Sequence, residues 1–175
     1  MAAKSEPRPQ HILLPVRVTT IVASFALALF VNFLPWRDPA LAPDFVALVL
    51  AFWCVRQPRL VGLGVGWLLG LLTDAGTGVL LGQHALAYSM LAFGALTLSR
   101  RIQWFPMSQQ SLHVALLLVA AEIVAMAVRL AAGADFPGWR LLVGPLLGAA
   151  LWPALTFVLL IPQRRSVEID ETRPI

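Results

Sequence analysis

Six apolar segments with short connections limit this chain more than any other feature. Each supplies most of the ~20 residues that a helix needs to cross the ~30 Å hydrocarbon core of a bilayer. Only 13% of the 175 residues are charged, against about 25% in an average soluble domain. We therefore predict an all-α, polytopic membrane protein, a bundle of six transmembrane helices at residues 18–34, 42–55, 60–74, 80–98, 112–132 and 141–161.

The positions of lysine and arginine predict the orientation, because positive charge is retained on the cytoplasmic side of short loops. With the N-terminus inside, the outer loops hold only Arg37 and Arg140, and Arg129 lies near the outer end of its segment. We expect cytoplasmic tails at residues 1–17 and 162–175 around a transmembrane domain at 18–161, in the bacterial inner membrane, with the first segment an anchor rather than a cleaved signal. The remaining basic residues all fall on the cytoplasmic side: Lys4, Arg8, Arg17, Arg56, Arg59, Arg100, Arg101, Arg164, Arg165 and Arg173.

Several function classes are disfavoured by what the sequence lacks. No loop exceeds about a dozen residues, so there is no room for a soluble catalytic domain, and no Walker loop, Gly-x-Ser-x-Gly, CxxC or HExxH motif occurs. The histidines do not cluster, which argues against a metal site, and the scattered basic residues argue against nucleic-acid binding. We predict no enzymatic activity and no cofactor.

Glycines recur every fourth residue in the third segment, at Gly62, Gly66 and Gly70. Small residues in this register let two helix backbones approach closely in lipid. Two interpretations stay open: packing within the bundle, which we favour, or a groove that faces a partner helix.

Segment six combines small residues with prolines. Gly144 and Gly148 permit close helix contact, and Pro145 and Pro153 remove helical hydrogen bonds and predict kinks. Trp152, beside Pro153, is placed to fill such a kink.

One acid and one histidine flank the glycine turn after segment three. Asp74 either ends that segment by binding backbone amides in the "DAGTG" turn or has a functional role, and the sequence favours neither. His84 has two possible partners, Asp74 across the turn or an outer group such as Arg129.

Two further acids occupy apolar segments. Asp44 follows Pro43 at the start of segment two, where a carboxylate caps free helix amides. Glu122 stands at the middle of the fifth segment, so it must face protein or water. We expect it to be neutral and hydrogen-bonded, with a proton or substrate pathway as the alternative. Arg129 lies ~10 Å further along the axis, too far for an ideal direct bridge.

Several of these motifs together resemble one family. "LPWRD", "PDFVALVLAFW", "GxGxxxGLLTDAGTGxxLGxHALAY" and "LWP", in residues 34–90 and 151–153, look like the bacterial rod shape-determining protein MreD family. The resemblance implies a non-catalytic inner-membrane scaffold of the elongation (rod) complex that binds MreC and supports peptidoglycan synthesis and cell shape. Further members of that complex would be MreB, RodA and a class B penicillin-binding protein, with membrane lipids around the bundle. The positions that match are Pro43, Asp44, Gly70, Asp74, Gly78, Gly82, His84, Trp152 and Pro153.

The resemblance also implies a fold similar to the substrate-binding subunits of energy-coupling-factor transporters. Those subunits usually carry an Ala-x-x-x-Ala motif on the first helix, and residues 18–34 lack it. The second function to weigh is therefore a membrane subunit that binds or transports a small molecule or lipid intermediate.

Overall fold

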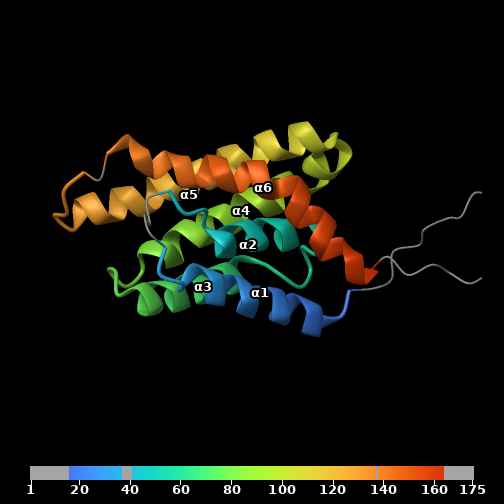
Figure 1. Ribbon diagram of the computed structural model, residues 1–175, viewed down its shortest axis with the longest axis horizontal. Coiled ribbons are helices and arrows are strands. Elements are labelled where there is room, and N and C mark those ends of the chain that lie inside the picture. The colour runs from blue at the N-terminus through green and yellow to red at the C-terminus, as the bar shows by residue number, and fades with distance from the viewer. Residues whose placement is uncertain (1–15, 37–40, 137, 164–175) are drawn as a thin grey trace, which may run out of the picture.

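The chain folds as helices arranged in pairs (Figure 1). The computed structural model describes residues 16–36, 41–136 and 138–163. Within these ranges the predicted all-α class is confirmed, and α2 with α4 lies between the pair α5 and α6 and the pair α1 and α3. The helices are α1 (Val18–Asn32), α2 (Phe45–Arg56), α3 (Leu63–Thr77), α4 (Gln83–Trp104), α5 (Met107–Ala131) and α6 (Val143–Leu160), with 3-10 turns at Trp139–Leu142 and Ile161–Gln163.

Several helix ends differ by three residues or more from the sequence prediction, including the start of α5 at Met107 rather than 112, and two of these differences change where charged residues lie relative to a helix end. Helix α3 continues past Asp74 to Thr77 and ends at Gly78, whose φ of 68° is the left-handed conformation that closes many helices. Helix α4 extends to Trp104, so Arg100 and Arg101 lie on its last turns rather than in a loop, where the helix dipole favours positive charge. Arg37 and nearly all of both predicted tails fall outside the described residues.

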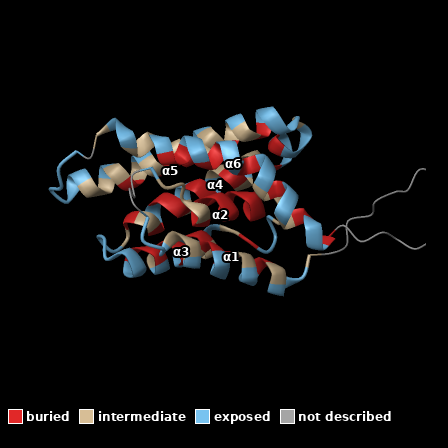
Figure 2. Ribbon diagram, in the orientation of Figure 1, coloured by how far each residue is buried: buried red, intermediate tan, exposed pale blue. Residues whose placement is uncertain are grey.

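Helix α2 is the central helix of the bundle. All ten residues from Val46 to Val55 are buried, and Trp53 donates from Nε1 to Ser24 Oγ at 2.8 Å, which ties α2 to α1. Twelve helical residues extend only about 18 Å, well short of a bilayer core. The apolar run of segment two thus reflects burial by other helices more than contact with lipid (Figure 2).

Two stretches of the described chain are long and apolar enough to cross a membrane by length and composition, α5 and the run Trp139–Gln163 that contains α6. Helices α1 and α2 are apolar but shorter. The described residues therefore form six α-helices, and this criterion selects two of them as candidate spans.

The outer surface of the bundle is apolar as well. Large hydrophobic side chains are exposed on every helix except α2, as Figure 2 shows for the outward faces. Because a soluble protein rarely exposes a contiguous apolar area of this extent, the surface is suited to lipid or to other membrane helices. Examples are Val22 and Phe30 on α1, Trp67 and Leu72 on α3, Met90 and Phe93 on α4, Leu112 and Leu116 on α5, and Leu151 and Phe157 on α6.

The glycines of α3 divide into two groups. A Cβ at Gly70 would lie 2.3 Å from Ala85 Cα, and one at Gly66 would lie 2.9 Å from the Tyr88 carbonyl oxygen, both on α4. The packing interpretation is therefore right for these two, and a partner groove there is wrong because α4 fills it. Gly62 departs from the stripe: it precedes α3 as its N-cap and has nothing within 4 Å of its Cβ position.

The sequence predicts two kinks in α6, and the structure shows a bend at one of the two positions. Pro153 lies inside the helix, and the second half of α6 (red in Figure 1) runs at an angle to the first. Pro145 is the third residue of α6, so its missing amide would have no helical acceptor and the predicted kink there is wrong. Trp152 is buried, and its ring centroid lies 6.0 Å from that of Phe52. Gly148 lies against Leu118.

Candidate functional site

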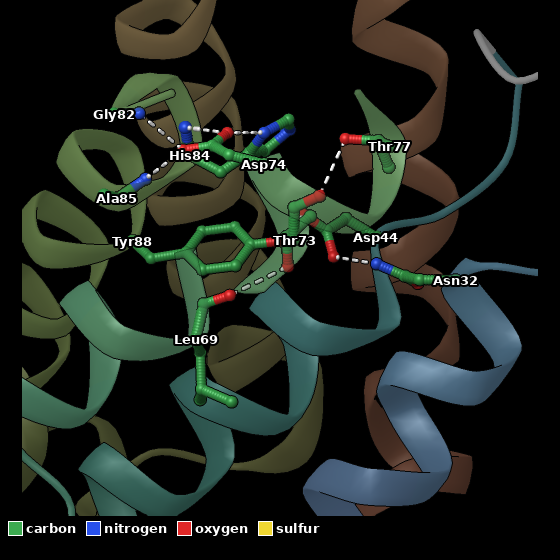
Figure 3. A network of polar contacts seen from close by, with 10 residues as sticks. All are labelled: Asn32, Asp44, Leu69, Thr73, Asp74, Thr77, Gly82, His84, Ala85 and Tyr88. Carbon is green, nitrogen blue, oxygen red and sulfur yellow. Dashed lines mark hydrogen bonds and ion pairs between the residues drawn. The ribbon is translucent and has the colours of Figure 1, made fainter. Parts of the chain in front are cut away.

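Asp74 is bound by the start of the next helix. Its side chain is fully buried. The turn after α3 reverses the chain and places the first amides of α4 over the last turns of α3. Asp74 Oδ2 accepts from the Gly82 amide at 2.8 Å, and Oδ1 accepts from the His84 amide at 2.9 Å. Oδ1 also lies 2.7 Å from His84 Nδ1, which pairs the two side chains (Figure 3).

This geometry settles the partners that the sequence left open. The amides that Asp74 binds belong to residues 82, 84 and 85, the last at 3.4 Å, and all lie beyond the "DAGTG" turn rather than within it. Of the two partners considered for His84, the structure shows Asp74. A carboxylate at a helix N-terminus satisfies free donors and is favoured by the helix dipole, so Asp74 stabilises the junction between α3 and α4.

Asp44 joins three helices. The predicted cap is confirmed, because Asp44 Oδ1 accepts from the Ala47 amide at 3.0 Å. The same oxygen accepts from Asn32 Nδ2 at 2.8 Å, and Oδ2 accepts from the Tyr88 hydroxyl at 2.5 Å (Figure 3). Asn32 in turn accepts from the Phe45 amide. The carboxylate therefore connects α1, α2 and α4.

Sequence reasoning missed Asn32, Tyr88 and Gln83. Tyr88 offered a signal, since it is the one tyrosine of the chain and a buried phenol hydroxyl usually has a polar partner. Asn32, near the end of an apolar segment, offered a weaker signal of the same kind. Gln83 follows the turn glycine Gly82 as the first residue of α4, and nothing in its local sequence distinguishes it.

An open cavity of about 730 Å³ lies at the end of the bundle where the polar groups gather. Its wall includes Asp44 from the start of α2, Gln83 and His84 from the start of α4, and Glu122 and Arg129 from α5. A second void of about 20 Å³ is lined by Asp44, His84 and Glu122 as well, and it is large enough for one water molecule.

Glu122 differs from the other two acids. Within the described residues no group donates a hydrogen bond to its carboxyl and no ion pair joins it to Arg129. The predicted hydrogen-bonded state is therefore not found. Glu122 instead lies half-buried on the cavity wall.

The structure brings together only part of the predicted site. Asp44, His84, Glu122, Arg129 and Gly144 all line the cavity. Asp74 lies behind His84, and the other predicted residues take part in helix packing or lie apart from the cavity: Gly62, Gly66, Gly70, Gly148, Trp152 and Pro153. No group of three metal-binding side chains occurs in the part of the chain that the structure describes.

The comparisons with known proteins agree with one another. The model of the family described as rod shape-determining protein MreD matches residues 12–161. The rod shape-determining protein MreD of Haemophilus influenzae is 31% identical over 156 residues, which cover 86% of this chain and 93% of that protein. No solved structure was found to match the chain, so the expected likeness to energy-coupling-factor subunits stays a prediction. On these matches the chain belongs to the MreD family of rod shape-determining proteins, membrane proteins with a role in rod shape determination.

Proposed function

We propose that this protein is a multi-pass scaffold of the bacterial inner membrane that binds MreC. Through MreC it would connect MreB, RodA and a class B penicillin-binding protein, and so support peptidoglycan synthesis. The family match supports the role in cell shape. The observation that carries the scaffold role is the apolar exterior of a bundle whose own helices are already closely packed.

The packing of the α3 glycines against α4 limits which surface of the bundle a partner helix could bind. Gly66 and Gly70 are covered by α4, so MreC must contact an outward face instead. Such faces are present on α1, α3, α4, α5 and α6, where large apolar side chains are exposed. In lipid, helices associate by close packing rather than by a hydrophobic drive, so any of these faces is chemically suitable.

Photo-cross-linking tests this proposal directly. A photoreactive residue would replace one exposed side chain on each outward face, with buried Leu91 as the matched interior control. The positions are Val22 on α1, Trp67 on α3, Met90 on α4, Leu116 on α5 and Leu151 on α6. We expect cross-links to MreC from at least one of the five faces and none from position 91. If every outward position fails to cross-link in cells whose rod shape the variant restores, direct binding to MreC is wrong.

The proposed topology has six spans and both termini in the cytoplasm. It is supported by the positions of the helix ends: the C-terminal ends of α1, α3 and α5 and the N-terminal ends of α2, α4 and α6 lie at the same end of the bundle (Figure 1). The single cysteine, Cys54, is buried, so Cys54→Ala gives a background for labelling. We expect an impermeant thiol reagent to label Asp135→Cys from outside and not Arg59→Cys. Equal labelling of both in intact cells would refute the topology.

A second function is favoured by one observation, the open cavity with Glu122 and Arg129 on its wall. A scaffold needs no such cavity. A subunit that also binds a small molecule or lipid intermediate would have one, and the chemistry of the wall identifies the class of ligand.

A further inference from the structure

The cavity contains polar groups without partners. Gln83 is 3% exposed, and no group in the described residues donates to its Oε1. Buried polar atoms nearly always have a partner, so an unsatisfied acceptor on a residue that lines the cavity favours a ligand or solvent molecule that reaches it. The Glu122 carboxyl on the same wall likewise has no donor in the described chain.

These two groups share one chemistry. The Gln83 amide oxygen and the Glu122 carboxylate both accept hydrogen bonds, and a carboxylate binds a cationic donor most strongly. Asp44 does not compete for that role, since its oxygens already accept from Asn32, Ala47 and Tyr88. The unmatched acceptors therefore favour an ammonium group.

Arg129 lies on the same helix as Glu122 and carries the opposite charge. It follows Glu122 by seven residues, so its Cα lies about 10 Å further along the axis of α5, and its side chain also lines the cavity. No carboxylate of the described residues forms an ion pair with it. A guanidinium in this position is suited to a carboxylate or phosphate.

We propose that this cavity binds a molecule that carries both an ammonium group and an acidic group. The ammonium would contact Glu122 and Gln83, and the acidic group would contact Arg129. The cavity volume of about 730 Å³ falls within the ~300–1,000 Å³ usual for small-molecule sites. Trp36 and Phe33 add aromatic surface to the wall, which also suits a cation.

Two sources present this chemistry. One is a lipid headgroup such as phosphoethanolamine, whose chains would lie on the apolar exterior, and the other is a free small zwitterion. The binding is separate from the scaffold role, because the cross-linking of MreC to outward faces requires no ligand in the cavity.

The test uses the full chain in detergent. Native mass spectrometry would compare phosphatidylethanolamine with phosphatidylglycerol, and calorimetry would measure free O-phosphoethanolamine. We expect binding of phosphatidylethanolamine, of O-phosphoethanolamine or of both, and the responding probe identifies the source. Binding of neither, or equal binding of phosphatidylglycerol and phosphatidylethanolamine with no response to the free compound, would overturn the proposal.

Substitutions test which residues contact each end of the ligand. Glu122→Gln should weaken binding about tenfold, as loss of one charge-assisted hydrogen bond implies, and Gln83→Met should act in the same direction. The matched control is Asp135→Asn, which removes an exposed carboxylate outside the cavity wall. Unchanged affinity in both cavity variants, or the same loss in the control, would refute the assignment.

Arg129→Gln should weaken O-phosphoethanolamine about tenfold and leave plain ethanolamine unaffected. Arg100→Gln, at an exposed position on α4, is its control. Equal effects on both ligands would exclude Arg129 as the contact for the acidic group. If Glu122→Gln fails to fold, Gln83→Met and Arg129→Gln still decide the proposal.

Discussion

Asp74 and Glu122 are both acidic residues in apolar helices, yet the hydrogen bonding of their carboxyl groups differs. Asp74 is fully buried and binds three amides and a histidine ring, whereas Glu122 has no donor in the described residues and lies on a cavity wall. The difference follows from helix chemistry. The first amides of a helix lack helical acceptors, and α4 offers these to Asp74, while the amides around the middle of α5 are already used.

The largest effect should come from Gly70→Ala, which would separate Asp74 from its donors. The added methyl would meet the backbone of Ala85, so α4 must move. We expect a loss of about 3 kcal/mol in the free energy of unfolding, at the upper end for overpacking, measured by denaturant titration in detergent.

Gly64→Ala is the matched control, because it lies on the same helix with open space at its Cβ position. It should change stability by less than about 1 kcal/mol, in the favourable direction, since alanine is the better helix former. Equal losses in the two variants would mean that the contact between α3 and α4 is not as close as described.

Asp74→Asn should have the next largest effect. The amide retains one acceptor oxygen, and because both oxygens of Asp74 accept from backbone amides, its NH₂ group faces a backbone N–H in either orientation, which leaves a buried donor unsatisfied. We expect a loss of about 2 kcal/mol, read from the midpoint of thermal unfolding in detergent. A change below about 0.5 kcal/mol would contradict the capping role.

Tyr88→Phe should have a smaller effect on the polar cluster at Asp44. It removes the hydroxyl that donates to Asp44 Oδ2 and leaves the two donors to Oδ1 in place. A loss of about 1 kcal/mol is expected, by the same measurement. A loss as large as that of Asp74→Asn would show that Tyr88, rather than the helix caps, holds this end of the bundle together.

Glu122→Gln should have the smallest effect on stability, within about 0.5 kcal/mol of the natural protein. No hydrogen bond in the described chain depends on its carboxyl, so its replacement breaks none. Thermal unfolding without added ligand measures this value. A destabilisation close to that of Asp74→Asn would show that the Glu122 carboxyl stabilises the fold as the Asp74 carboxyl does.

The sequence by itself determined the elements of the fold and their local ends. Apolar runs predicted the helices to within a few residues, Asp44 after Pro43 predicted the cap of α2, and Pro153 predicted a bend in α6. These features depend on residues that are neighbours along one helix, where spacing alone fixes geometry.

Only the tertiary structure decided which acid is bound and which is free, and which glycines are covered. Gly64 and Gly66 are two residues apart, but only Gly66 meets α4. Asp74 and Glu122 look alike in the sequence, because the amides that bind Asp74 belong to the next helix. The partners of a side chain in a helix bundle come from other helices, and the spacing within one helix does not specify how they are arranged.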